Sequence, residues 1–294
     1  MLTHLQTGTP RLPARTVIIG AGGFVGGAIA RLIAQRGGKV VALSRKDVDL
    51  MAPDAAERLT ALLAPGDAVV AAAAKAPCKD VAMMVDNMIM AKAMVGALCK
   101  AEISHLVNIS SDAVYADEPL PLSERSPAAP TSMHGAMHLA REIAFASEVK
   151  APMAQLRPTL IYGAADPHNG YGPNRFRRLA KAGQDIVLFG EGEERRDHVL
   201  VDDVAELAVR ILSHRSQGVL NATTGTVHSF RSVAEQVVAI SPTKVRISGS
   251  PRQGPMPHNG FRSFDPAAAL AAFPGFTFTT LEAGLKKVQT EGNG

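Results

Sequence analysis

The residues best suited to proton chemistry are two histidines four positions apart, His134 and His138. On a helix this spacing places both imidazoles on one face, one turn apart. Imidazole titrates near pH ~6.5, so it can exchange a proton at neutral pH without a cationic neighbour. Glu142 continues the same spacing, which leaves a metal site as an alternative. We expect no metal, because no other ligand is evident in the sequence.

A glycine-rich turn from Gly20 to Gly26 predicts a second function, the binding of a pyrophosphate. It follows an apolar run at 16–19 and leads into a helical pattern at 27–34. Glycine lets the backbone turn tightly and approach a ligand closely, and a helix N-terminus offers free N–H groups to an anion. We therefore expect cofactor contacts from the following loop residues: Gly20, Gly22, Gly23, Phe24, Val25 and Gly26.

The end of the next apolar run indicates which dinucleotide is bound. An acid at this position would bind the ribose 2′-hydroxyl of NAD, whereas a nearby arginine accommodates the 2′-phosphate of NADP. Here the run ends in Ser44, Arg45 and Lys46. NADP is favoured over NAD, with a simple solvated loop as the alternative.

Apolar runs and helical patterns alternate through the first half of the chain. Strands are expected at 17–19, 39–43, 68–71, 106–109 and 153–156, and helices at 27–36, 55–63, 83–100 and 135–148. This rhythm predicts an α/β fold with a doubly wound parallel sheet of the Rossmann type. After about residue 164 the sequence instead predicts loops with short helices and strands between them. We expect a dinucleotide-binding domain at 1–164, to which 198–225 returns, and a smaller α/β substrate-binding region at 165–294.

Composition excludes several other classes of function. The net charge is only +4, and aromatic residues make up 4% of the chain, so a nucleic-acid surface is not expected. The sequence has two cysteines, no secretory signal and no unbroken apolar run of membrane-spanning length. These features predict a cytoplasmic protein that does not enter a membrane. Short arginine clusters favour a small, anionic substrate.

Six segments in chain order carry a resemblance to a known family. They are the glycine loop, Asp67-Ala68-Val69-Val70-Ala71-Ala72-Ala73-Ala74, Asn87, Ile109-Ser110-Ser111-Asp112-Ala113-Val114-Tyr115, Leu156-Arg157-Pro158-Thr159-Leu160-Ile161-Tyr162-Gly163 and Arg196-Asp197-His198-Val199-Leu200-Val201-Asp202-Asp203-Val204. Over roughly residues 15 to 290 the chain resembles the extended short-chain dehydrogenases/reductases, typified by nucleotide-sugar epimerases and dehydratases.

The resemblance implies roles for residues that the local patterns leave open. Ser111 would hydrogen-bond the substrate oxygen, and Arg196 would reach a substrate diphosphate. Cofactor contacts would also come from Ala72, Ala73, Ala74, Asn87, His138 and Pro158. Further substrate contacts are expected from Tyr162, Asn174 and Arg262. Members often form homodimers, here through the helices near 83–100 and 134–148.

One departure from the family limits the functional prediction. Members carry Y-x-x-x-K, in which the tyrosine exchanges the proton, but here His134 replaces the tyrosine and His138 the lysine. In the preferred interpretation the protein is an NAD(P)-dependent oxidoreductase or epimerase acting on a carbonyl–alcohol pair of a sugar or nucleotide sugar. His134 then carries the proton, and Ser111 and His138 complete the catalytic set. The alternatives are an NADP(H)-binding sensor or scaffold without redox chemistry, and a cofactor-free isomerase or hydrolase.

Overall fold

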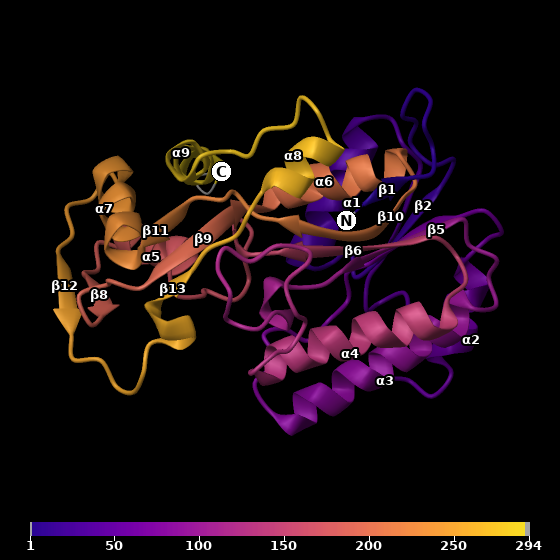
Figure 1. Cartoon of the computed structure of the whole chain (residues 1–294), viewed down its shortest axis with the longest axis horizontal. Helices are drawn as coiled ribbons and strands as arrows, with labels where there is room; N and C mark the ends of the chain where they lie inside the picture. The colour runs from indigo at the N-terminus through magenta and orange to yellow at the C-terminus, as the bar shows by residue number, and fades with distance from the viewer. Residues whose placement is uncertain (1, 292–294) are drawn as a thin grey trace.

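Short runs of β-branched and other apolar residues form a seven-stranded sheet in the larger part of the protein. The computed structural model describes residues 2–291 (Figure 1). The strands lie in the order β1-β10-β6-β5-β4-β2-β3, and all pairs are parallel except β1 with β10. Their bounds are β1 (Thr3–His4), β2 (Thr16–Ile19), β3 (Val40–Leu43), β4 (Ala68–Ala71), β5 (His105–Ile109), β6 (Met153–Pro158) and β10 (Ser216–Ala222).

The strand order explains where a ligand can bind. From β2 the chain steps outward to β3 and then returns to the other side of β2 as β4. The first five parallel strands therefore have the order 2-1-3-4-5, which is one of the two common doubly wound orders. The predicted fold class is confirmed. Ligands of such sheets bind beyond the carboxyl ends of the strands where the order reverses, here at β2 and β4.

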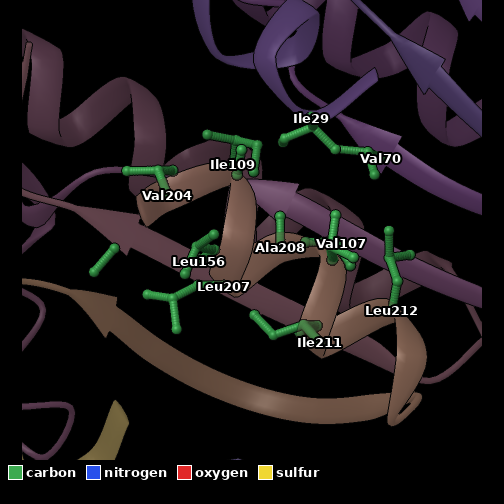
Figure 2. Packing of buried hydrophobic residues seen from close by; sticks show 14 of the residues in the cluster. Ile29, Val70, Val107, Ile109, Leu156, Val204, Leu207, Ala208, Ile211 and Leu212 are labelled. Carbon is green, nitrogen blue, oxygen red and sulfur yellow. The ribbon is translucent and has the colours of Figure 1, made fainter. Parts of the chain in front are cut away.

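Helices cover both faces of this sheet (Figure 1). One layer holds α1 (Phe24–Gln35), α6 (Val201–Ser213) and α8 (Ala267–Ala272), and the other holds α2 (Ala55–Leu62), α3 (Val81–Leu98) and α4 (Met133–Glu148). Because side chains alternate along a strand, Val70 packs in the first layer and Val69 in the second. Figure 2 shows the first core, where Val204, Leu207 and Ile211 of α6 approach the sheet.

Helix α3 is long and apolar enough, by length and composition alone, to cross a membrane. It nevertheless contains Asp86, Asn87 and Lys92, and it packs against α2 and α4. Its residues Met94 and Leu98 are buried in the second core. In this structure α3 is therefore a packed helix of the α/β fold.

The smaller part of the protein contains two short sheets and three helices (left side of Figure 1). Among the described residues, the first sheet joins β7 (Leu160–Tyr162), β9 (Arg195–Leu200), β11 (Val227–Ser229) and β13 (Phe261–Arg262), and the second pairs β8 (Ile186–Phe189) with β12 (Ile247–Ser250). The helices are α5 (Pro173–Lys181), α7 (Phe230–Ile240) and α9 (Leu281–Glu291). Phe176, Leu188, Val233 and Leu285 form part of their common core.

The chain passes between the two parts several times. It returns to the large sheet through α6 and β10, as well as through α8, which packs beside β10. The predicted boundaries at 1–164 and 165–294 stay predictions, and their residues 1 and 292–294 lie outside the described range. The N-terminal segment joins the large sheet at its edge. Its strand β1 pairs with β10, and His4 binds Ser216 Oγ at 2.7 Å.

Asp197 on β9 is the buried polar group that links the small sheet to the large one. Its carboxylate accepts hydrogen bonds from the hydroxyls of Thr159 (3.0 Å), Thr223 (2.9 Å) and Thr224 (2.9 Å). It also accepts from the backbone N–H groups of Thr224 (3.1 Å) and Gly225 (2.8 Å). These donors follow β6 and β10, so one side chain of β9 binds the ends of two strands of the large sheet.

We predict that Asp197→Ala lowers the free energy of unfolding by about 3 kcal/mol, because it leaves several buried donors without an acceptor. Urea denaturation followed by circular dichroism measures this change. Asp185→Ala, which removes a carboxylate paired with exposed Arg246, is the control and should lower the stability far less, because exposed ion pairs contribute little. Equal losses in the two variants would contradict the linking role.

Candidate active site

The glycine loop forms a cradle that no larger side chain could occupy. Gly20 has φ +96°, and a Cβ there would lie 2.6 Å from the backbone nitrogen of Ala73. A Cβ on Gly26 would lie 2.3 Å from the carbonyl oxygen of Gly20. Gly23 caps α1 without a side-chain hydrogen bond, so the first turn keeps its N–H groups for a ligand. The loop therefore fits a pyrophosphate.

A cavity of about 450 Å³ extends from this cradle across the ends of β2, β3 and β4. Many of the predicted cofactor residues line it, namely Gly20, Gly22, Gly23, Ser44, Arg45, Lys46, Ala72, Ala73 and Ala74. Phe24, Val25 and Gly26 lie beside it as the first residues of α1. Apolar walls with a few polar groups are typical of a nucleotide site. The residues present thus fit the adenosine half of a dinucleotide.

Both positively and negatively charged side chains lie at the polar end of this cavity. Ser44 Oγ donates to Asp47 at 2.8 Å, and Arg45 pairs with Asp49 at 3.1 Å. The Arg45 side chain is 78% exposed, so its ion pair is weak and easily exchanged. Hydrogen bonds from Ser44 lower the pKa of Asp47.

Two other predicted cofactor residues are buried in supporting positions. Asn87 on α3 accepts from the Lys75 N–H at 2.9 Å and donates to the Lys75 carbonyl at 3.0 Å. It therefore fixes the loop after β4 rather than pointing into the cavity. Pro158 is buried at the end of β6 and is absent from the lining of the 450 Å³ cavity.

Ser111 immediately follows β5, on the segment that enters the short helix η1 (Asp112–Val114). Its Oγ accepts the Ala113 N–H at 3.2 Å and donates to Asp112 Oδ1 at 3.3 Å. The start of α4 presses on this segment, since a Cβ on Gly135 would lie 2.0 Å from the Ala113 carbonyl. The structure thus brings Ser111 and the first turn of α4 together.

The two histidines lie on α4, as the spacing predicted, with their rings edge to face and centroids 4.7 Å apart. His134 Nδ1 accepts the backbone N–H of Cys78 at 3.3 Å, so its neutral ring carries the proton on Nε2. Burial lowers the pKa of His134, an effect opposed by Asp112. His138 is almost fully buried, and its Nδ1 has no partner. Burial, with Arg141 and His134, holds its pKa well below the usual range.

Glu142, the third residue of the alternative metal site, binds other side chains in this structure. Glu142 accepts from Arg157 Nε at 2.8 Å and also from the Ser110 hydroxyl. The Arg157 guanidinium lies 4.8 Å from the centre of the Tyr115 ring. Within residues 2–291, no group of three or more His, Cys, Asp or Glu side chains is placed to hold a metal ion.

The predicted substrate arginines occupy different environments. Arg196 on β9 is mostly buried, and its Nε lies 3.1 Å from Glu194 Oε1 in an ion pair that lacks hydrogen-bond alignment. Burial lowers its pKa, whereas Asp112 and Glu194 raise it. Arg262, predicted as a substrate contact, is instead 2% exposed and bonded to Asp112 and Asp117.

Two further residues that were predicted to contact the substrate lie in packed positions. Tyr162 is buried against α9, where a Cβ on Gly284 would lie 1.9 Å from its hydroxyl. Asn174 accepts the Gly163 N–H at 3.1 Å and donates to the Ile161 carbonyl at 3.3 Å, which fixes the end of β7. Tyr162 thus packs between β7 and α9, and Asn174 joins α5 to the end of β7.

A sequence model of the NAD dependent epimerase/dehydratase family matches residues 16–223. The chain belongs to this family. The match covers the glycine loop, Ser111, both histidines and Arg196. The predicted family resemblance is confirmed.

Solved structures of other enzymes share the fold of this family member. UDP-glucose 4-epimerase of Thermus thermophilus, in complex with NAD, is 23% identical, with 95% of this chain and 99% of that chain covered and a TM-score of 0.79. UDP-N-acetylglucosamine 4-epimerase of Bacillus cereus is 22% identical, with 95% and 96% covered and a TM-score of 0.81. The GDP-L-fucose synthetase of Naegleria fowleri bound to NADP is 17% identical, with 99% and 97% covered and a TM-score of 0.81.

The structure adds site residues that the sequence did not reveal. The Cys78 backbone N–H sets the tautomer of His134, and His258 together with Asp117 contacts Arg262. The contact from Cys78 is made by its backbone N–H, which does not depend on the residue type, so the sequence could not reveal it. The sequence could not show the second contact either, because Asp117 and Arg262 lie 145 residues apart in the chain.

We predict that His138 makes this family member acid-sensitive. The folded protein keeps His138 neutral, whereas the unfolded chain binds a proton there below pH ~6.5, so stability falls as pH falls. The His138 contribution between pH 6.5 and 5.5 is about 1 kcal/mol. Urea unfolding of His138→Gln should show a shallower pH slope than the parent. His168→Gln, which removes an exposed histidine, is the control and should keep the pH dependence of stability of the parent. If His138→Gln also keeps that pH dependence, the prediction is refuted.

Proposed function

We propose that this protein is an NAD(P)-dependent oxidoreductase or epimerase that acts on a carbonyl–alcohol pair of a sugar or sugar nucleotide. The observation that carries this proposal is the shared carboxyl edge of the parallel strands, where the dinucleotide cradle follows β2 and Ser111, in contact with the first turn of α4, follows β5. Family membership supports a nicotinamide cofactor. The similar structures are named for UDP-glucose, UDP-N-acetylglucosamine and GDP-L-fucose, which supports a sugar-based substrate.

The residues suggest how the substrate oxygen is handled. When bound, the nicotinamide would supply or accept the hydride. During carbonyl reduction, Ser111 Oγ–H and His134 Nε2–H would donate to the substrate oxygen and stabilise its developing negative charge. His134 would pass its proton to that oxygen. His138, buried behind it, would contact the cofactor ribose in place of the family lysine.

Arg45 supports NADP as the preferred cofactor. Its guanidinium is exposed beside the 450 Å³ cavity and pairs with Asp49. Lys46 lines the same end of the cavity. A 2′-phosphate offers Arg45 a stronger, bidentate partner than the single carboxylate oxygen that it now contacts.

An exposed apolar face supports a homodimer. Val81, Val85 and Ile89 follow one another at four-residue spacing along α3 and are 66%, 51% and 39% exposed. Ile143 on the neighbouring helix α4 is 59% exposed. These helices pack side by side, so two copies could bury the combined face as a four-helix bundle.

We expect NADPH to bind more tightly than NADH by about tenfold or more, because Arg45 adds a charge-assisted contact to the phosphate. Titration by nicotinamide fluorescence measures both affinities. Arg45→Ala should weaken NADPH binding by about tenfold and leave NADH binding unchanged. Arg246→Ala, which removes another exposed arginine far along the chain, is the matched control. A preference for NADH would refute the role of Arg45.

Turnover tests the catalytic roles. With NADPH and a panel of keto-sugars, His134→Ala and Ser111→Ala should each lower kcat/KM by about a hundredfold, since each removes a donor to the reacting oxygen. NADPH affinity should not change in either variant, and His168→Ala should retain parental activity. Equal turnover of parent and His134→Ala would exclude the proton role. Tight NADPH binding with no turnover of any substrate would instead favour a sensor or scaffold.

A further inference from the structure

Arg262 has no donor left for a substrate. Its Nη1 donates to Asp117 at 2.5 Å, and its Nε lies 3.4 Å from Asp112 Oδ2. Its Nη2 donates to the backbone carbonyls of Asp112 (2.9 Å) and Tyr115 (3.4 Å). All three guanidinium nitrogens therefore bind the segment that follows Ser111. With the side chain 2% exposed, Arg262 positions that segment and does not face an incoming anion.

The other two arginines near this segment are also paired. Arg196 Nε lies 3.1 Å from Glu194, and Arg252 lies 3.7 Å from Glu193 and 3.8 Å from Glu194. Arg196 also interacts electrostatically with Asp112, which bonds the Ser111 hydroxyl. Among the described residues, the buried Nε atoms of Arg196 and Arg252 make no hydrogen bond.

The charges of this cluster do not favour a diphosphate. It holds three guanidiniums, Arg196, Arg252 and Arg262, against four carboxylates, Asp112, Asp117, Glu193 and Glu194. Three positive and four negative charges give a net charge of −1. A nucleoside diphosphate would bring at least two more negative charges into this partly buried cluster, where like charges repel strongly. The same carboxylates are good acceptors for hydroxyl groups.

We infer that the substrate of this site carries no diphosphate. It is an uncharged, hydroxylated carbonyl compound, or the matching alcohol, such as a free sugar. Its hydroxyls donate to the carboxylates of this cluster of three arginines and four acids, and one of its oxygens accepts from the Arg196 guanidinium. This inference rests on the proposed function and selects the free sugar over the sugar nucleotide. It also replaces the expected anionic substrate with a neutral one.

Calorimetric titration of the full protein with UDP and GDP tests the inference. Saturating NADP+ keeps the 450 Å³ cavity filled, so that the nucleotides report only on the substrate site. We expect Kd values weaker than about 1 mM for both. A tighter Kd for either nucleotide overturns the inference. Failure to bind NADPH or NADH would instead overturn the proposed function, so the two failures are distinguishable.

A gain of binding provides the second test. Glu194→Gln removes one carboxylate and releases Arg196 Nε, so it should strengthen UDP binding by about tenfold. Asp185→Asn removes an exposed carboxylate outside the cluster and should leave UDP binding as in the parent. If Glu194→Gln fails to strengthen UDP binding, the carboxylates do not exclude the diphosphate and the inference is overturned.

Discussion

The buried ion pair between Glu142 and Arg157 fixes the helix of the two histidines against the sheet. Glu142 lies two turns beyond His134 on α4, and Arg157 lies on β6 near its end. The Ser110 hydroxyl donates to the same carboxylate, so the serine segment is tied into the pair. Each partner is almost fully buried, and a buried charge without its partner is strongly destabilising. The relative placement of α4, β6 and the serine segment thus depends on one interaction.

The proposed replacement of a tyrosine and a lysine by His134 and His138 is chemically consistent. A phenol needs a nearby cation to lose its proton near neutral pH, but an imidazole does not. Here the environment keeps both rings neutral, because burial opposes an imidazolium. The Cys78 backbone then selects the Nε2–H form of His134. The site therefore presents a hydrogen-bond donor whose direction is set by the fold.

Local patterns predicted the larger part of the fold well. The glycine loop, the apolar strands β2, β4 and β5, and the helices α1 and α4 each depend mainly on neighbouring residues, and all lie close to their expected bounds. Other strands, most of them in the smaller part, were harder to predict from the sequence. Strand β9 begins with charged residues, and β1 and β13 are two residues long, so neither apolar runs nor alternation reveals them. Their pairing is decided by distant partners.

The sequence by itself determined the sheet class, the dinucleotide cradle and the single helical face of His134 and His138, because each follows from residue type at short spacing. Only the tertiary structure decided which of the predicted site residues line a cavity and which are buried. Arg262 lies about 150 residues from Asp112 in the chain, yet the fold joins them and removes the arginine from the substrate. Tyr162 and Asn174 likewise contact segments that no local pattern connects to them.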